Sequence, residues 1–360
     1  MDTSFNDFEL RKKDHIRLAL ESSTQALIQS GFSKIKLQHQ ALPEINFSEV
    51  SLKVKLLGHE FSSPHFVASM TAGHEHSYKI NLNLALAAYK NNWLMAVGSQ
   101  SRELLDPTAA LEWKKIKTEV PGIKLISNIG ILEVLSYSTS NIIKLTENID
   151  AIGLFIHLNP LQELFQNNQQ VNLAGALQAI EQLVKKSHIP ILIKEVGFGI
   201  NKELCHKLFA IGVKIVDVSG GGGTHWGQIE ALRQPADSLI FKASEAFHDW
   251  GQTTLACLLE LQDENLFHQI WASGGIRNGV DSAKCLAMGA RAVGLAQPLM
   301  KAAVETTVTH SEKNEEKSTE ATSIIMQQFD YQLKVAMFCS GIKKCEDFLH
   351  KKVWYGTKNN

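Results

Sequence analysis

The sequence lacks the features that mark several specialised classes of protein. Its five cysteines among 360 residues never form a CxxC pair, so neither a disulfide framework nor a zinc site is expected. Free thiols suit a reducing compartment, and the polar, charged N-terminal residues contain no apolar core of a secretory signal. No stretch approaches the ~20 apolar residues of a membrane span. We therefore expect a cytoplasmic protein without a membrane partner.

An excess of charge of either sign is also missing. Lysine and arginine total 36 against 37 aspartate and glutamate residues, which gives a formal net charge of −1. Proteins that bind nucleic acid usually carry an excess of basic residues, so we expect no nucleic-acid partner. A local basic site for a small anion is compatible with this balance.

Short apolar runs separated by helical patterns dominate what is present. Such runs are typical of parallel strands buried on both faces, and helical periodicity lies between most of them, as at 78–91, 173–187 and 281–288. Because the runs number eight, we expect a single α/β domain over residues 1–360, folded as a (β/α)8 TIM barrel. An open doubly wound sheet is the alternative. The runs are 66–70, 93–97, 123–127, 151–156, 190–194, 213–218, 269–273 and 291–295.

Two later regions depart from this alternation. Residues 225–255 form a long insert between the sixth and seventh runs, which is typical of a lid or a binding loop. Its tryptophans are expected in the core or the lid. Residues 305–321 are charged and poor in apolar residues, so we expect a solvated loop there. A helix over 324–339 that stops at Gly341 should follow.

Glycine-bearing segments lie at 217–226, 272–279 and 288–298. Small residues at strand ends expose backbone N–H groups, which bind phosphate oxygens. The last two strands of a barrel commonly form a phosphate site. The pattern therefore predicts a phosphorylated cofactor.

Small and polar residues follow the apolar runs, at the ends where a barrel carries its chemistry. Lys194 follows a buried run, where a charge is costly without a partner, so a buried anion is expected beside it. The stretch HLNPLQE (157–163) places four hydrogen-bonding side chains within seven residues. We predict that they form the bottom of the substrate-binding site, which we call the substrate floor. The residues after the runs include Thr71, Ala72, Gly73, Ser99, Asn128, His157, Asn159, Gln162, Glu163, Lys194, Ser219, Thr224, Gly274, Gly275, Ala296 and Gln297.

Several of these residues also have a structural interpretation. Thr71, Ser99 and Asn128 could cap the helices that follow them, and His157 could be a hydrogen-bonded core histidine. The charged group Arg11–His15 is either an exposed helical face or a cap that closes on a doubly charged anion. His74 and His76 invite a metal site, but a solvated loop is the expectation for them.

Together these segments resemble type 2 isopentenyl-diphosphate isomerase, a family of FMN-dependent barrels. The resemblance runs in order from about residue 9 to about residue 345. RKKDHI (11–16) combined with HLNPLQE is its most specific part. The other matching segments are MTAG (70–73), AVGSQ (96–100), NIG (128–130), KEVGFGI (194–200), DVSGGGGTHW (217–226), ASGGIRNG (272–279) and GLAQP (294–298).

The resemblance implies the reaction, its cofactors and its assembly. A member of this family interconverts isopentenyl and dimethylallyl diphosphate with reduced FMN and Mg²⁺, and without net redox change. NADPH is the usual reductant. The resemblance also implies a homo-oligomer, either a tetramer or an octamer, and a substrate-capping role for the segment of about 1–60.

Residue roles follow from the same resemblance. Arg11, Lys12, His157 and Gln162 would bind the substrate, and Glu163 would bind the Mg²⁺. Gln162, His157 and Asn159 would form the catalytic group, in which Gln162 orients the substrate first and relays a proton second. The FMN contacts would be Thr71, Ala72, Gly73, Ser99, Asn128, Lys194, Ser219, Thr224, Gly274, Gly275, Arg277, Ala296 and Gln297.

Ala72 departs from the family pattern, which more usually has glycine there, and two other functions stay open. FMN barrels that oxidise 2-hydroxy acids carry a histidine base in the turn after the sixth strand. Here that turn is Ser219–Thr224 and His225 is displaced, so an FMN-dependent 2-hydroxy-acid oxidase is the alternative function. A flavin-binding scaffold is the third, although the many polar groups at the strand ends argue against it.

Overall fold

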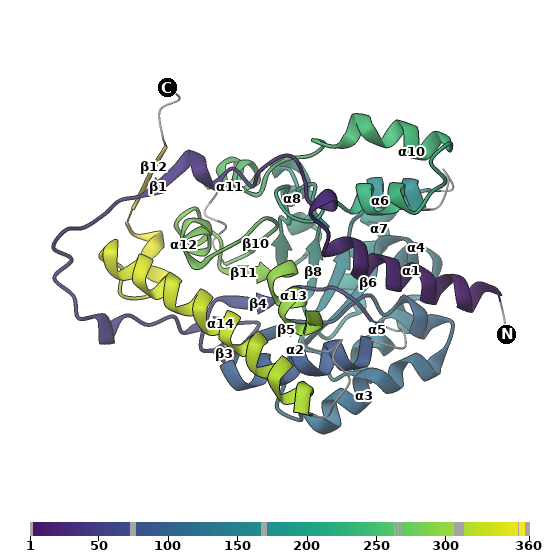
Figure 1. Cartoon of the computed structure of the whole chain (residues 1–360), viewed down its shortest axis with the longest axis horizontal. Helices are drawn as coiled ribbons and strands as arrows, with labels where there is room; N and C mark the ends of the chain where they lie inside the picture. Colours follow the sequence, from purple (N-terminus) through teal and green to yellow (C-terminus); the bar gives the residue numbers. More distant parts are fainter. Residues whose placement is uncertain are drawn as a thin grey trace.

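A closed barrel of eight parallel strands forms the centre of the computed structural model (Figure 1). Each predicted apolar run overlaps one strand, so the barrel is confirmed and the open doubly wound sheet is wrong. The structure describes residues 3–72, 77–166, 171–262, 264, 266, 268–305, 313–351 and 353–356. The strands, in order around the barrel, are β4 (His65–Val67), β5 (Leu94–Ala96), β6 (Leu125–Gly130), β7 (Leu154–His157), β8 (Ile191–Lys194), β9 (Ile215–Asp217), β10 (Ile270–Ser273) and β11 (Ala292–Leu295), which pairs with β4.

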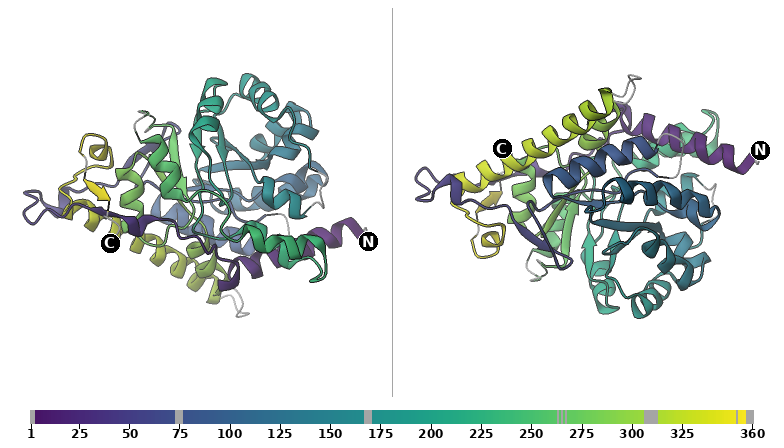
Figure 2. Two further views of the ribbon diagram at one scale, coloured as in Figure 1. Left: turned by 90° about the horizontal axis from the view of Figure 1, so that it is seen from above. Right: turned by 90° about the horizontal axis from the view of Figure 1, so that it is seen from below.

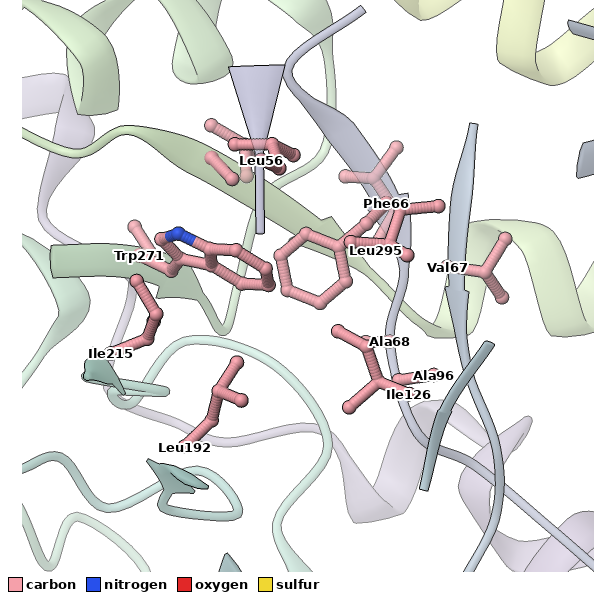
Figure 3. Packing of buried hydrophobic residues seen from close by; sticks show 14 of the residues in the cluster. Leu56, Phe66, Val67, Ala68, Ala96, Ile126, Leu192, Ile215, Trp271 and Leu295 are labelled. Atoms are coloured by element: carbon pink, nitrogen blue, oxygen red, sulfur yellow. The ribbon is translucent and has the colours of Figure 1, made fainter. Parts of the chain in front are cut away.

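Large apolar side chains fill the inside of the barrel (Figure 3). Phe66, Phe155 and Trp271 are fully buried there. The ring centroids of Phe66 and Trp271 lie 5.0 Å apart, and those of Phe155 and Trp271 lie 6.0 Å apart. A filled interior is typical of eight-stranded barrels and leaves the ends of the strands to carry a site.

Helices surround the barrel, and α14 lies across α2, α12 and α13 (Figure 1). The predicted helices at 78–91, 173–187 and 281–288 are confirmed as α2, α7 and α12. The helices are α1 (Thr3–Ala19), α2 (Ser77–Asn91), α3 (Ala110–Glu119), α4 (Ile131–Ser136), α5 (Thr139–Asn148), α6 (Pro160–Gln166), α7 (Ala176–Lys186), α8 (Lys202–Ala210), α9 (Trp226–Leu232), α10 (Leu239–Ser244), α11 (Thr254–Leu261), α12 (Gly279–Ala287), α13 (Gln297–Glu305) and α14 (Lys313–Cys339).

The solvated loop expected over 305–321 is wrong for the second half of that segment. α14 begins at Lys313 and therefore includes it, whereas residues 306–312 lie outside the described residues. Ser318 is fully buried, and both hydrogen-bonding functions of its hydroxyl are satisfied there. It donates to the Ala303 carbonyl at 3.0 Å and accepts from Asn83 Nδ2 at 2.9 Å. The polar residues thus serve helix packing, where each buried polar group needs a partner. The helix expected over 324–339 is confirmed.

The N-terminal helix and the insert lie beside each other at one end of the barrel. α1 contacts α9, which belongs to the insert together with α10, and Figure 2 (left) shows α1 alongside the green insert helices. Two short antiparallel pairs lie outside the barrel: β1 (Ile35–Leu37) with β12 (Trp354–Gly356), and β2 (Val54–Leu56) with β3 (His59–Phe61). Within the described ranges, none of the helices combines the length and the apolar character that a bilayer crossing demands.

Candidate functional site

Two adjoining pockets lie at the end of the barrel where the strands reach their carboxyl ends. We call the first the glycine pocket, because Gly197, Gly220, Gly223, Gly274, Gly275 and Gly294 line it. We call the second the polar pocket, because its lining includes Arg11, Asn128, Glu133, His157, Gln162 and Glu163. The residues that line both pockets are Lys12, His15, Ser69, Met70, Lys194, Val196 and Trp226. Two molecules bound in the two pockets would therefore share one wall.

The backbone of the glycine pocket tolerates only glycine at its tightest point. Gly274 has a φ of +97°, and a Cβ added to it would lie 2.0 Å from the Gly220 carbonyl oxygen. Gly275 is also left-handed, with a φ of +69°. At the same wall, the Arg277 guanidinium donates to Gln297 Oε1 at 3.0 Å and to Gln25 Oε1 at 2.9 Å. A bare backbone beside a guanidinium is suited to a phosphate group.

Most of the predicted cofactor residues line the glycine pocket. Ser99 and Asn128 line the polar pocket instead, and Ala72 is buried without being part of either lining. Gly73, like His74 and His76, lies outside the described residues. The structural interpretation of Asn128 as a helix cap is wrong, because the N-cap of α4 is Gly130. The residues in the glycine pocket are Thr71, Lys194, Ser219, Thr224, Gly274, Gly275, Arg277, Ala296 and Gln297.

α1 carries its charged residues over the polar pocket. Arg11, Lys12 and His15 line the pocket, whereas Lys13 is exposed. The interpretation of this group as an exposed helical face is therefore wrong for the three lining residues. Burial lowers the pKa of the Lys12 ammonium to about 8, and the nearby Arg11 guanidinium adds to this shift. Two neighbouring, partly desolvated cations favour an anionic ligand.

A buried carboxylate from the insert completes the polar pocket. Glu230 on α9 is fully buried, and its Oε1 lies 2.7 Å from His15 Nε2 and accepts from Gln162 Nε2 at 3.1 Å. Its Oε2 accepts from Arg233 Nη1 at 2.8 Å. Burial alone would raise the pKa of Glu230, but the contact with His15, the hydrogen bond from Gln162 and the charge of Arg233 lower it to about 2. Glu230 is therefore ionised at neutral pH.

Hydrogen bonds fix the side chains of the HLNPLQE stretch. His157 Nδ1 lies 3.1 Å from Asn128 Oδ1. Burial, helped by the charges of Lys194 and Lys12, lowers the pKa of His157 to about 3, so its ring is neutral. Asn159 Nδ2 donates to Gln162 Oε1 at 3.1 Å and to Glu163 Oε1 at 2.8 Å. The structure thus brings the predicted substrate floor together.

Sequence reasoning missed Glu230 and Glu133, and it expected Trp226 in the core or the lid. Trp226 lines both pockets, and its ring lies 5.3 Å from the His15 ring, edge to face. Glu133 lines the polar pocket from α4, where burial raises the pKa of its carboxyl group. The weak signal for Glu230 is its place on the apolar side of the short helix WGQIEAL, one turn after Trp226.

Comparison with known proteins agrees with this architecture. A family model described as FMN-dependent dehydrogenase matches residues 17–120 and 157–354. Among solved structures, lactate oxidase of Pediococcus acidilactici is similar with a TM-score of 0.64 and 13% identity, covering 100% of this chain and 96% of that chain. A flavocytochrome b2 variant with bound pyruvate has a TM-score of 0.65 and 16% identity, covering 97% and 86%. At these identities the likeness shows the fold alone.

Curated relatives are more similar in sequence. An isopentenyl-diphosphate delta-isomerase of Bdellovibrio bacteriovorus is 39% identical over 357 residues, covering 98% of this chain and 99% of that protein. Proteins of the same name in Legionella pneumophila (39% identity, 98% and 99% covered) and Oceanobacillus iheyensis (38% identity, 94% and 93% covered) are also similar. The chain therefore belongs to the FMN-dependent dehydrogenase family and, within it, to the type 2 isopentenyl-diphosphate delta-isomerases.

Proposed function

We propose that the protein interconverts isopentenyl and dimethylallyl diphosphate, with reduced FMN in the glycine pocket and the Mg²⁺ complex of the diphosphate in the polar pocket. The observation that carries this proposal is the wall that the two pockets share, which includes Lys12, Lys194 and Trp226. This wall would bring a flavin ring and a C5 chain into contact. NADPH is the proposed reductant.

The glycine pocket fits FMN. A Cβ at Gly274 would strike the backbone, and Arg277 stands at the same wall, so Gly274, Gly275, Arg277 and Gln297 would hold the phosphate. Lys194 and Ser219 would contact the ring. When bound, reduced FMN supplies an electron-rich ring face and nitrogen atoms that exchange protons with the substrate.

The polar pocket suits a diphosphate with a divalent cation. Arg11 and Lys12 would bind phosphate oxygens, and this binding energy would position the C5 chain. Asn159 Oδ1 is buried and has no hydrogen-bond partner among the described residues, although Asn159 Nδ2 donates to Glu163. An amide oxygen beside a carboxylate matches the oxygen ligands that Mg²⁺ prefers, so Asn159 and Glu163 would hold the ion together with the substrate.

Gln162 and Glu230 are placed to control a proton. The Gln162 amide donates to Glu230 and accepts from Asn159, so its orientation is fixed. An amide is a poor acid by itself. The ionised Glu230 behind it orients the amide through a charge-assisted hydrogen bond and would stabilise positive charge nearby, while Gln162 would orient the C5 chain first and relay a proton second. Trp226 and α1 would keep water from a short-lived cation on the C5 chain.

The turn Ser219–Thr224 contains no histidine that could serve as the base for the alternative function, oxidation of 2-hydroxy acids. His225 is the histidine nearest to the expected turn, but its Nδ1 accepts from the Gln228 N–H at 2.9 Å and its Nε2 lies 2.8 Å from the Phe247 carbonyl oxygen. Burial lowers the pKa of His225, and the residue is absent from the described lining of both pockets. His225 therefore caps α9 instead of facing a substrate.

The test separates the two functions. The purified protein is loaded with FMN, reduced anaerobically and given isopentenyl diphosphate with Mg²⁺. Dimethylallyl diphosphate should form with reduced FMN and not with oxidised FMN. A 2-hydroxy acid should leave the yellow colour of the oxidised protein unchanged. Bleaching by the 2-hydroxy acid, without isomer formation, would contradict the proposal.

We also propose a cytoplasmic homo-oligomer, either a tetramer or an octamer. Leu239 at 72% exposure and Trp250 at 57% are both large apolar side chains of the insert, which could be covered in such an assembly. Light scattering coupled to gel filtration checks the subunit number. A monomer at micromolar concentration would be inconsistent with it.

A further inference from the structure

A buried carboxylate lies beneath the glycine pocket without lining it. Asp217, the last residue of β9, is fully buried and is absent from the described lining of both pockets. Its two oxygens contact two neighbouring strand ends. Oδ2 accepts from the Ser273 hydroxyl at 2.7 Å, and Oδ1 accepts from the Ser219 N–H at 3.2 Å. Burying a carboxylate of this kind costs free energy unless hydrogen bonds or an opposite charge compensate it.

The contact with Ser219 holds a strained backbone. Ser219 has a φ of +39°, which is unfavourable for a residue with a side chain. Such strain persists only where the surroundings enforce it, and it gathers at functional sites. At this position the Ser219 N–H donates to Asp217, and Ser219 lines the glycine pocket.

The contact with Ser273 reaches the phosphate end of the same pocket. Ser273 ends β10 and directly precedes Gly274 and Gly275. The Thr254 hydroxyl donates to the Ser273 and Gly274 carbonyl oxygens at 3.0 and 2.7 Å, so this turn is fixed from the other side as well. The Asp217 carboxylate thus links the turn at Ser219 to the turn at Ser273–Gly274, and both turns border the glycine pocket.

The charge of Asp217 also acts on Lys194. The two residues are partners in the parallel register of β8 and β9, so their side chains leave the sheet on the same side. Burial lowers the pKa of Lys194, whereas the carboxylates of Asp217 and Glu195 oppose this shift. Glu195 has four backbone donors for its Oε2, the N–H groups of residues 196–199 at 2.6, 2.7, 2.5 and 3.3 Å. Burial also raises the pKa of Asp217, whereas the charge of Lys194 and the hydrogen bonds from Ser273 and Ser219 favour its ionised form; of the two carboxylates, Asp217 has the larger effect on the pKa of Lys194.

We propose that Asp217 is a positioning residue for FMN: it fixes the Ser219 and Ser273–Gly274 turns, and its negative charge limits how far Lys194 stabilises the anionic reduced flavin. The inference rests on the proposed FMN site and adds a residue to it that does not touch the cofactor. It predicts that the affinity for FMN and the reduction potential of bound FMN change together when the carboxylate is neutralised.

The main experiment compares Asp217→Asn with the wild type. The amide keeps one hydrogen bond of each polarity and removes the charge. FMN binding to the apoprotein, measured by the quenching of flavin fluorescence, should weaken on the order of tenfold, as expected when charge-assisted hydrogen bonds become neutral ones. The midpoint potential should rise, and the ratio of oxidised to reduced FMN dissociation constants should increase by about tenfold, because a buried anion near the ring is gone. An unchanged or lower potential would overturn the proposal.

A double variant tests the turn itself. Glycine adopts a positive φ without cost. Ser219→Gly in the Asp217→Asn background should therefore recover about fivefold in FMN affinity, whereas the same change in the wild type should weaken or not alter it. Equal effects in the two backgrounds would show that Asp217 does not support the turn.

Two further variants control for simple damage. Asp330→Asn also neutralises a hydrogen-bonded carboxylate, but Asp330 lies on α14, where it contacts His65 and Trp93 and lines neither pocket, so the FMN affinity and potential should stay as in the wild type. If Asp217→Asn does not fold, Ser273→Ala takes its place. It should weaken FMN binding severalfold without raising the potential, and wild-type affinity in this variant would overturn the proposal. If the wild-type protein itself bound no FMN, the proposed function would fail, and not this inference alone.

Discussion

The two pockets of this protein are built in different ways. The phosphate end of the glycine pocket is made of backbone at the ends of neighbouring strands, and a side chain at Gly274 would obstruct it. The polar pocket is made largely of side chains that α1, α4, α6 and α9 bring from distant parts of the chain, joined by Asn128, His157 and Lys194 from the strand ends. The difference teaches that a phosphate-binding site can be built mainly from the backbone at strand ends. A site for a specific substrate, in contrast, needs side chains that several helices bring together.

We expect the largest effect from a substitution that obstructs the glycine pocket. Gly274→Ala forces a left-handed backbone, which costs about 1–2 kcal/mol, and adds a clash with the Gly220 carbonyl. We expect the purified variant to retain less than about a tenth of the bound FMN, as measured from its visible spectrum. Gly289→Ala is the matched control, because Gly289 has a φ of +100° but open space around its Cα. Equal FMN loss in both variants would mean that strain, and not the close approach, shapes the pocket.

The next effect concerns the proton path in the polar pocket. Glu230→Gln removes the carboxylate that orients Gln162, so kcat for the isomerisation should fall by a factor on the order of 10² while FMN stays bound. The measurement is turnover of reduced enzyme at saturating substrate. Glu181→Gln on the outer helix α7 serves as the control and should behave like the wild type. A variant that loses affinity for substrate but keeps kcat would refute this role.

Glu163→Gln sharpens the comparison, because it should weaken Mg²⁺ binding in the polar pocket and leave FMN binding in the glycine pocket unchanged. The neutral amide is a weaker ligand, so the Mg²⁺ concentration for half-maximal activity should rise by about tenfold. FMN content should be that of the wild type, since Glu163 lines the polar pocket and not the glycine pocket. An unaltered Mg²⁺ dependence would take Glu163 out of the metal site.

The smallest effect is a pH dependence. The pKa of Lys12 is lowered to about 8, so the empty pocket loses this charge as the pH rises through about 8. Diphosphate binding favours the charged form, and its dissociation constant should therefore increase by up to about tenfold per pH unit above that value. Lys12→Arg should remove the dependence, whereas Lys13→Arg on the exposed side of α1 should keep it. Titration calorimetry between pH 7 and pH 8.5, where the total change should be about fourfold, measures it.

The comparison also explains what the sequence could predict. The eight strands were predictable because each is buried on both faces and therefore reads as a continuous apolar run. The glycine pocket was predictable because Gly274, Gly275 and Ser219 lie directly after such runs. Glu230 was not predictable, because its hydrogen-bonding partner Gln162 is 68 residues away and only the tertiary fold brings them together. The helical start of α14 was hidden for a related reason: the partners of Ser318 belong to other helices.

Simultaneous occupation of the two pockets is the central claim, and a spectral titration tests it most directly. Isopentenyl diphosphate with Mg²⁺ is titrated into the FMN-loaded protein, and the flavin absorbance is followed together with the FMN released into a filtrate. We predict a saturable difference spectrum with all FMN retained, because the diphosphate would bind against the shared wall. Release of FMN in proportion to the diphosphate added would contradict the account, since it would mean that both molecules compete for one pocket.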